Sequence, residues 1–239
     1  MPGGKAPLFR RRLVSIVLIL VFGLVVVTMP TGLYVLKPGP AKDLAAMVTV
    51  TGGPTAAEGR LVMVTIRADR ATPLAIMIAA FEPGWDLVPR RSLIPPGQSE
   101  EDYMRNASRQ MTESQQVAEL VAAGYLQRRL PPVGFDVGEI GGPSAGIMFA
   151  LEIVRQAEGT PPAGGVIVAG SGMLLPDGRV AAVGGVRQKA IAARRAGAKL
   201  FIVPRSEADL ALSAAGGMRV VAVDDFAQAA RELFGPESP

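Results

Sequence analysis

Residues 13–36 constrain the folding of this chain most, because they form one continuous stretch without a charged side chain. As an α-helix, the stretch would be about 36 Å long at about 1.5 Å per residue, and the hydrocarbon core of a bilayer is about 30 Å thick. Lys5, Arg10, Arg11 and Arg12 precede it, whereas Lys37, Lys42 and Asp43 follow it. The stronger basic flank predicts a single-pass membrane helix with a cytoplasmic N-terminus and an extracytoplasmic domain after it.

A cleaved signal peptide is the alternative for this stretch, since signal peptides also combine a basic start with an apolar segment. Their cleavage sites are small-residue patterns of the A-x-A type, and this chain has no alanine between Ala6 and Ala41. A retained membrane anchor is therefore the preferred interpretation. The chain has 239 residues, which leaves room for one globular domain of ordinary size after the anchor.

The chain contains neither histidine nor cysteine. This composition excludes Ser-His-Asp and Cys-His catalytic groups, and also the common metal sites built from these residues. We therefore expect no metal and no other cofactor. The pI of 9.8 invites a nucleic-acid interpretation, but the net charge is only +4 and four basic residues lie at the N-terminus. Solvated surface charge is favoured over nucleic-acid binding.

A glycine-rich turn, Gly-Gly-Pro-Ser-Ala-Gly at residues 141–146, separates an alternating apolar run from a continuous one. The pattern predicts a strand, a tight turn and a helix with Ser144 at its start. The first backbone N–H groups of a helix have no intrahelical partner and favour negative charge on a nearby oxygen. We expect Ser144 to be a nucleophile, supported by Gly142, Pro143 and Ala145, with backbone N–H groups holding the oxyanion.

The general base for such a serine must be a lysine, because Ser-Lys is the remaining well-attested arrangement when histidine is absent. The chain has five lysines, of which Lys5, Lys37 and Lys42 lie in or beside the N-terminal apolar segment. Lys199 begins an apolar run and is typical of a solvated strand edge. Lys189 lies on a predicted helix, on the side of its small apolar residues and away from its arginines. An inward lysine in an arginine-rich chain indicates a group that must lose its proton.

The remaining segments predict strands and helices in mixed order, which places the fold in the α+β class. Pro83 to Pro96 is expected to be a loop around Trp85, and Pro176-Asp177-Gly178 a hairpin turn. Expected strands are 47–51, 61–66, 166–175, 179–183, 200–203 and 220–223. Expected helices begin after Thr72, Ser99, Gly185, Ser206 and Asp224, with Thr72, Ser99 and Ser206 as N-caps.

Residues 141–153 (GGPSAGIMFALEI) and 170–204 (GSGMLLPDGRVAAVGGVRQKAIAARRAGAKLFIVP) resemble the catalytic domain of Lon-type serine proteases. They are most similar to the membrane-anchored YlbL type, which usually carries a PDZ domain. In that family the serine of the PSAG turn is the nucleophile and the lysine of the GG-x-x-x-K helix is the base, here Ser144 and Lys189. A hydroxyl residue eighteen positions before the lysine orients it, which implies this role for Ser171. Met111 to Ser114 also resembles a family motif, and Ser114 is either a hydrogen-bonding residue near the active site or an ordinary helix serine.

The resemblance implies a Lon catalytic-domain fold after one transmembrane helix, and a hexameric ring. The expected segments are a basic N-terminus (1–12), the membrane helix (13–36), an N-terminal part of the catalytic domain (37–130) and the proteolytic core (131–239). Two features depart from the family. Residues 126–132 join the long helix directly to the next strand, which leaves no space for a PDZ domain, and no lysine has the G-x-x-x-x-G-K-[ST] setting of an ATPase loop.

Together these features predict a membrane-anchored, ATP-independent serine endopeptidase. Its expected substrates are unfolded or loosely structured proteins and peptides, either extracytoplasmic or in the membrane. Two alternatives stay open. One is a catalytically silent relative that serves as a binding or assembly module at the membrane. The other is an esterase or amidase that uses the same Ser144-Lys189 dyad on small substrates.

Overall fold

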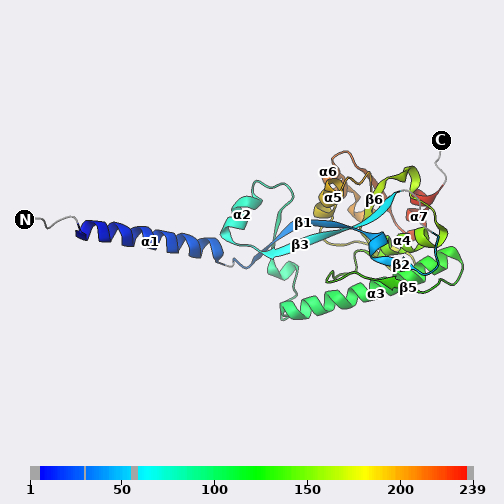
Figure 1. The fold of residues 1–239 in the computed structure, drawn as a ribbon, viewed down its shortest axis with the longest axis horizontal. Helices are drawn as coiled ribbons and strands as arrows, with labels where there is room; N and C mark the ends of the chain where they lie inside the picture. The colour runs from blue at the N-terminus through cyan, green and yellow to red at the C-terminus, as the bar shows by residue number, and fades with distance from the viewer. Residues whose placement is uncertain (1–5, 30, 55–58, 236–239) are drawn as a thin grey trace, which may run out of the picture. The chain divides into compact units, whose positions relative to one another are not determined.

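The structure is a computed structural model that describes residues 6–29, 31–54 and 59–235. It divides into two compact units. The smaller unit comprises residues 1–36 and 68–93, and the larger comprises residues 37–67 and 94–239. Two long strands, β1 (Leu33–Asp43) and β3 (Arg60–Arg70), carry the chain from one unit to the other (Figure 1).

The smaller unit contains helix α1 (Ala6–Thr28), the short helix α2 (Pro73–Ala79) and strand β4 (Asp86–Pro89), with a 3₁₀ turn at Arg90–Ser92. The first residues of β1 pair antiparallel with β4, with Tyr34 opposite Val88. This pairing places a strand inside the segment 83–96 that we expected to be a loop. Thr72 caps α2 as predicted, because its side chain accepts a hydrogen bond from the Ala75 N–H.

Helix α1 is long and apolar enough to cross a membrane over Phe9–Thr28, with a mean hydropathy of 2.3. A signal sequence near an N-terminus passes the same test. The predicted end of this helix at Leu36 is wrong, because the helix ends at Thr28 and residues 34–36 are buried in β1. The helix begins at Ala6, so it also includes Arg10 to Arg12, which precede the predicted membrane segment.

The larger unit is built on a mixed sheet in the order β10-β9-β6-β3-β1. Strands β6 (Ile167–Gly170), β9 (Leu200–Pro204) and β10 (Arg219–Val223) run parallel, and β3 is parallel to β6. Helices link these strands, because α5 (Val186–Arg195) precedes β9 and α6 (Ala208–Ala215) joins β9 to β10. The connections are those of an α/β domain.

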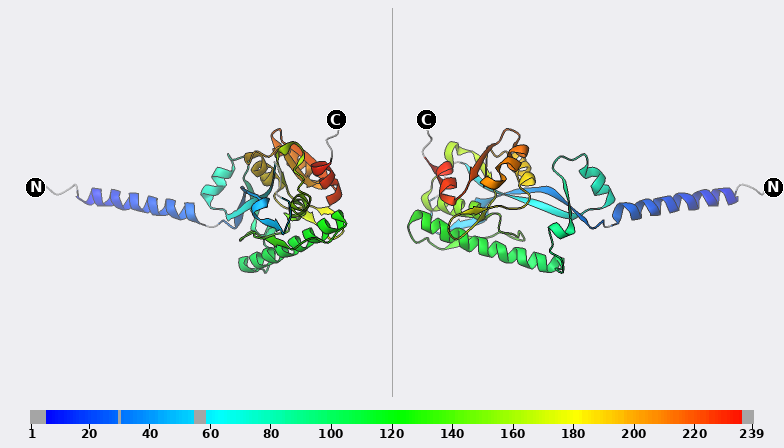
Figure 2. Two further views of the ribbon diagram at one scale, coloured as in Figure 1. Left: turned by 45° about the vertical axis from the view of Figure 1, so that its right-hand side comes forward. Right: turned by 180° about the vertical axis from the view of Figure 1, so that it is seen from behind.

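Successive strand residues face two separate cores, as the period-two geometry of a strand requires. Leu61, Val168 and Ile202 pack on one side with helices α3 (Glu100–Leu126), α4 (Gly146–Glu158) and α7 (Phe226–Phe234). Val62, Ala169 and Phe201 pack on the other side with α5 and α6 (Figures 1 and 2). The expectation of mixed helices and strands is confirmed. Segregated layers, which the α+β class implies, are not found, because helices cover both faces of the sheet.

Several local predictions are also settled. The hairpin around Pro176 to Gly178 is confirmed by the pairing of β7 (Met173–Leu174) with β8 (Val180–Ala181), and the capping box at Ser99 is confirmed. Strand β2 (Val48–Val50) pairs with β5 (Val133–Phe135) in a small second sheet. The N-cap predicted at Ser206 is wrong, because a 3₁₀ turn at Arg205–Glu207 precedes α6 and Glu207 occupies the cap position.

Candidate active site

The turn at residues 141–146 is fixed against helix α3. The Gly142 N–H donates to the Ala107 carbonyl over 2.8 Å, and Ser114 Oγ donates to the Pro143 carbonyl over 3.2 Å. Gly142 has a φ of 97°, in the region that favours glycine. A Cβ on Gly146 would lie 2.8 Å from Ser114 Oγ. Ser114 is therefore buried against this turn, which places its hydroxyl group at the candidate site rather than in ordinary helix packing.

Ser144 is held on its other side by the link between β6 and β7. Its carbonyl accepts hydrogen bonds from the Gly172 N–H at 2.9 Å and from Ser171 Oγ at 3.2 Å. Helix α4 begins at Gly146 with Ala145 as its N-cap, so Ser144 precedes the helix by two residues. Within the described ranges, the backbone N–H groups of Ser144 and Ala145 donate no hydrogen bond inside the protein. These two donors are available to an oxyanion beside Ser144.

Lys189 projects from α5 into the interior of the larger unit, as the helix pattern predicts. Only 3% of its surface is exposed, and its neighbours on the helix, Val186, Ala190 and Ala193, are buried with it. Its Nζ donates a hydrogen bond of 2.9 Å to Ser171 Oγ. Because Ser171 Oγ in turn donates to the Ser144 carbonyl, a chain of hydrogen bonds runs from the lysine through Ser171 to the backbone of Ser144.

The surroundings of Lys189 favour its neutral form. Burial lowers the pKa of Lys189 from its ordinary 10.5 to about 8, because desolvation disfavours the charged ammonium. With this pKa, about one lysine in ten is neutral at pH 7 and about half at pH 8. A buried amine that loses its proton near neutral pH is suited to general-base chemistry.

Glu207 opposes part of this effect, and sequence reasoning missed it. Its negative charge raises the pKa of Lys189, although less than burial lowers it. Glu207 Oε2 accepts a hydrogen bond of 2.9 Å from the Val183 N–H, which holds the carboxylate in place. Burial raises the pKa of Glu207, whereas that hydrogen bond and the charge of Lys189 lower it. The sequence offered no signal for this charge interaction, because Glu207 lies in the 3₁₀ turn before α6 and is brought near Lys189 by the packing of α6 against α5.

The two candidate reacting atoms are Ser144 Oγ and Lys189 Nζ. In the part of the chain that the structure describes, no hydrogen bond joins Ser144 Oγ to Lys189 Nζ, and the lysine is bonded to Ser171 instead. Catalytic hydrogen bonds are often long or misaligned without substrate and tighten in the complex. The structure thus brings Ser144, Ser171, Lys189 and Ser114 into one region, with Lys189 connected through Ser171 to the backbone of Ser144.

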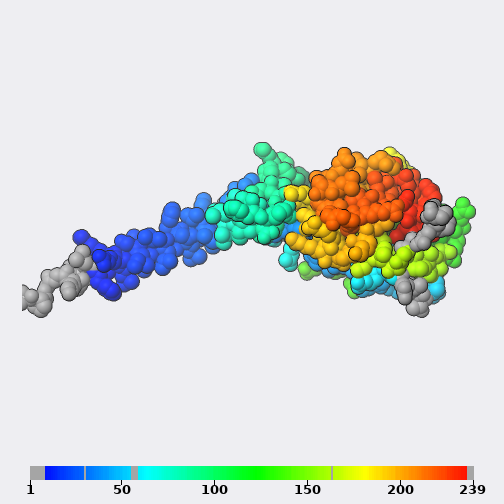
Figure 3. Space-filling model, turned by 90° about the horizontal axis from the view of Figure 1, so that it is seen from above, coloured from blue at the N-terminus to red at the C-terminus, as the bar shows by residue number. Residues whose placement is uncertain are grey.

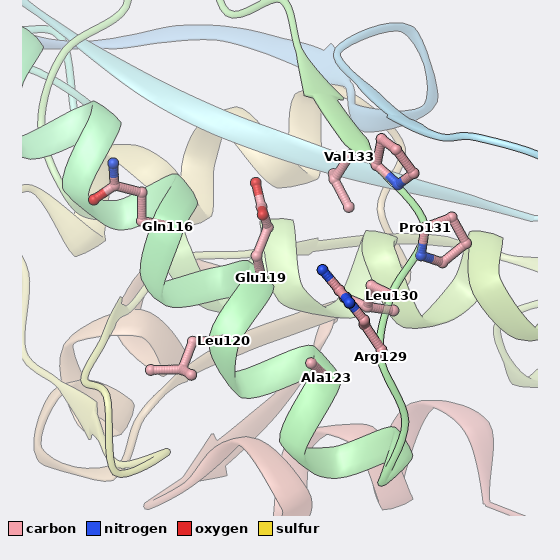
Figure 4. Close-up of a pocket in the computed structure, with 9 residues that line it drawn as sticks. Gln116, Glu119, Leu120, Ala123, Arg129, Leu130, Pro131 and Val133 are labelled. Carbon is pink, nitrogen blue, oxygen red and sulfur yellow. The ribbon is translucent and has the colours of Figure 1, made fainter.

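One surface hollow lies away from this site. It has a volume of about 690 Å³ and lies between α3 and residues 129–133, with Glu119 and Arg129 reaching into it (Figure 4). Its lining includes none of Ser144, Ser171 and Lys189. Among the described residues, no cluster of three or more acidic, histidine or cysteine side chains could hold a metal ion.

The region that contains Ser144, Ser171 and Lys189 is similar in sequence to known proteins. Residues 138–234 match the family model of the Lon protease (S16) C-terminal proteolytic domain. A mitochondrial Lon protease homolog of Kluyveromyces lactis is 32% identical over 143 residues, which cover 52% of this chain and 12% of that protein. A Lon protease of Clostridioides difficile is 44% identical over 70 residues, covering 29% and 9%. A Lon protease of Malacoplasma penetrans is 28% identical over 171 residues, covering 63% and 21%. The chain therefore spans only about a tenth to a fifth of the length of these relatives.

Proposed function

We propose that this chain, whose residues 138–234 form a Lon-type (S16) serine protease domain, is a membrane-anchored endopeptidase that works through a Ser144-Lys189 dyad without ATP. The observation that carries the proposal is the state of Lys189. This lysine is almost fully buried, its pKa is lowered to about 8, and its Nζ is connected through Ser171 to the backbone of Ser144. Burying an ammonium group costs free energy, so a lysine with only a structural role would be expected at the surface.

In the acylation step, neutral Lys189 removes the proton of Ser144 while Ser144 Oγ attacks the scissile carbonyl carbon. The carbonyl oxygen becomes an oxyanion, which the N–H groups of Ser144 and Ala145 stabilise. The carbon–nitrogen bond then breaks, and protonated Lys189 gives its proton to the leaving amine. The products of this step are an acyl-enzyme on Ser144 and a free amine.

In the deacylation step, Lys189 removes a proton from water as the water oxygen attacks the ester carbonyl. The tetrahedral intermediate collapses, the bond to Ser144 Oγ breaks, and Ser144 recovers a proton from Lys189. Ser171 acts as a positioning residue, because its hydroxyl accepts from Lys189 Nζ and can rotate without carrying a charge. A small movement of the lysine from Ser171 toward Ser144 completes the dyad.

Other parts of the chain support a proposal for where the reaction takes place and for its substrates. Helix α1 supports a membrane anchor, and its basic flank supports a cytoplasmic N-terminus with the protease domain outside. The chain has no phosphate-binding G-x-x-x-x-G-K-[ST] loop, so we propose unfolded or loosely structured proteins as substrates. We also propose a homo-oligomer, with a hexamer as the form that the resemblance to Lon proteases implies.

Labelling with a serine-reactive fluorophosphonate probe tests the catalytic part of this proposal. The full chain in detergent should react at Ser144, and Ser144→Ala should abolish labelling without loss of circular dichroism. Ser213→Ala is the matched control, because Ser213 is an exposed serine on α6. Equal labelling of wild type and Ser144→Ala would favour the silent binding module instead. If cleavage of casein strictly required ATP, the proposal that the enzyme works without ATP would be wrong.

A further inference from the structure

Helix α2 of the smaller unit exposes an apolar face that a water-soluble domain would bury. Leu74, Met77 and Ile78 follow one another at spacings of three and one residues, which places them on one side of the helix, and Phe81 lies in the turn just after it. All four are exposed, up to 84% for Phe81. No residue of α2 is buried. An amphipathic helix in water turns such a side toward the protein, so this face needs another explanation.

The segment around this face is also free of charge. Residues 71–81 (ATPLAIMIAAF) contain no acidic or basic side chain. On the other side of the helix, Ile76 and Ala79 are half-buried and line a hollow of about 560 Å³ together with Trp85. The apolar face is thus the more exposed side of the helix.

Hydrogen bonds tie the start of this segment to the chain that leaves α1. Thr31 Oγ1 donates to the Ala71 carbonyl over 2.6 Å, and the Ala71 N–H donates to the Leu33 carbonyl over 2.8 Å. Helices α1 and α2 are in contact within the smaller unit, and residues 72–81 lie beside the C-terminal end of α1 (Figures 1 and 3). If α1 spans a bilayer, α2 must therefore lie at the surface where the chain emerges.

We propose that the face formed by Leu74, Met77, Ile78 and Phe81 inserts into the lipid bilayer next to α1. This inference rests on the proposed membrane anchor. Short apolar helices at a bilayer surface bury their apolar side about 5 to 10 Å into the boundary between headgroups and acyl chains. Trp85, the single tryptophan, lies at the edge of the segment, where tryptophan is favoured at membrane interfaces. Lipid is preferred over a second copy of the chain because contact with α1 keeps α2 beside the anchor in every copy, whether or not copies associate.

The absence of cysteine from the sequence makes a direct test possible. Single variants Met77→Cys and Phe81→Cys of the full chain are labelled with an environment-sensitive NBD fluorophore. The labelled chains are reconstituted into vesicles of phosphatidylcholine and phosphatidylglycerol, with and without lipids that carry a nitroxide quencher at a shallow position, for the labels at 77, 81 and 212, or at a deep position of the acyl chain, for the label at 21. Val21→Cys reports on the anchor, since Val21 is in the middle of α1. Leu212→Cys is the matched control, because Leu212 is similarly exposed but lies on α6 of the larger unit.

The proposal predicts that the nitroxide lipids reduce the fluorescence of labels at positions 77 and 81 at least about twofold, and that the label at 212 is unaffected. Quenching at 21 without quenching at 77 and 81 overturns the insertion of α2 and leaves the anchor in place. Absence of quenching at 21 as well removes both the anchor and the insertion. Energy transfer between copies at 77 and 81 without lipid quenching assigns the face to a second copy of the chain, and this result also overturns the proposal.

Discussion

Helices α2 and α4 have similar apolar sequences but opposite surroundings. Every residue of α4 from Gly146 to Arg155 is buried, whereas no residue of α2 is. Helix α4 is packed against the sheet and α3 within the larger unit, so its apolar side chains have partners. Helix α2 has no buried residue, and its least exposed side chains, such as Ile76 and Ala79, are only half-buried. The comparison teaches that apolar sequence does not by itself decide burial. In α4 it creates a rigid support for the Ser144 turn, and in α2 it leaves a surface for another apolar medium.

Matched phenylalanine truncations test this comparison with the largest expected effect. Phe149→Ala in α4 should lower the free energy of unfolding by about 3 to 5 kcal/mol, because it leaves a cavity in a closed core. Phe81→Ala, just after α2, should change it by less than about 0.5 kcal/mol in detergent, because the side chain is exposed. Denaturant unfolding followed by circular dichroism measures both. Equal losses of stability would mean that α2 is packed as tightly as α4.

A lysine pair extends the comparison to a charged side chain. With a folded pKa of about 8 and an ordinary pKa of 10.5, the unfolded chain binds more protons than the folded one between these pH values. The cost of burying the ammonium is therefore complete below pH 8 and vanishes above about pH 10.5. Lys189→Met should be more stable than wild type by roughly 3 kcal/mol at pH 7, less the loss of one hydrogen bond, and the gap should close as pH rises.

Lys199→Met is the control for that experiment, because Lys199 is exposed and lies just before β9. Its free energy of unfolding should follow that of wild type at every pH. If Lys189→Met were instead less stable than wild type at pH 7, Lys189 would be a stabilising residue, and the cost assigned to its burial would be wrong.

Two serines provide the next contrast. Ser171 is buried and accepts from Lys189, whereas Ser213 is exposed on α6. Ser171→Ala should slow peptide cleavage about 10- to 100-fold, because the lysine loses its orienting partner but keeps its basicity. Ser171→Thr should restore most of the rate, since it returns the hydroxyl group. A rate for Ser171→Ala equal to that of Ser213→Ala would leave Ser171 without a role in positioning.

The smallest expected effect is a shift in the pH dependence of activity, which a comparison of Glu207 with Asp209 tests. Glu207→Gln removes a negative charge that raises the pKa of Lys189, so the pKa of the lysine should fall. The rise of activity with pH should then move to lower pH, by up to about one unit. Asp209→Asn is the control, because Asp209 is exposed on α6. An unchanged midpoint in Glu207→Gln would show that its charge is screened from the lysine.

Local signals in the sequence predicted the parts of the fold that depend on neighbouring residues. The Thr72 and Ser99 caps and the hairpin after Leu175 follow from side chains within a few positions. Strand β4 was missed because its partner in β1 is distant along the chain. The end of α1 was placed too late because an uncharged run can continue a membrane helix or enter a buried strand, and residues 33–36 do the latter.

The residues of the candidate site also divide into those that the local sequence predicted and those that it could not. The inward direction of Lys189 followed from the pattern of its own helix. Ser171 was proposed only through the resemblance to Lon proteases, since its position eighteen residues before the lysine has no meaning in local geometry. The charge of Glu207 beside Lys189 could not be predicted, because it depends on how α5 and α6 pack and on a 3₁₀ turn where we expected a serine cap.

The pH dependence of Ser144 modification tests the central claim, that Lys189 is the base for Ser144, most directly. The rate constant for fluorophosphonate labelling of the full chain should rise with pH, with a midpoint of about 8, as Lys189 loses its proton. Lys189→Arg should react at least about 100-fold more slowly and without that midpoint, because guanidinium stays protonated. Lys189→Met, which also lacks a base, should behave in the same way. Labelling of either variant at the wild-type rate, with the same midpoint, would contradict the account.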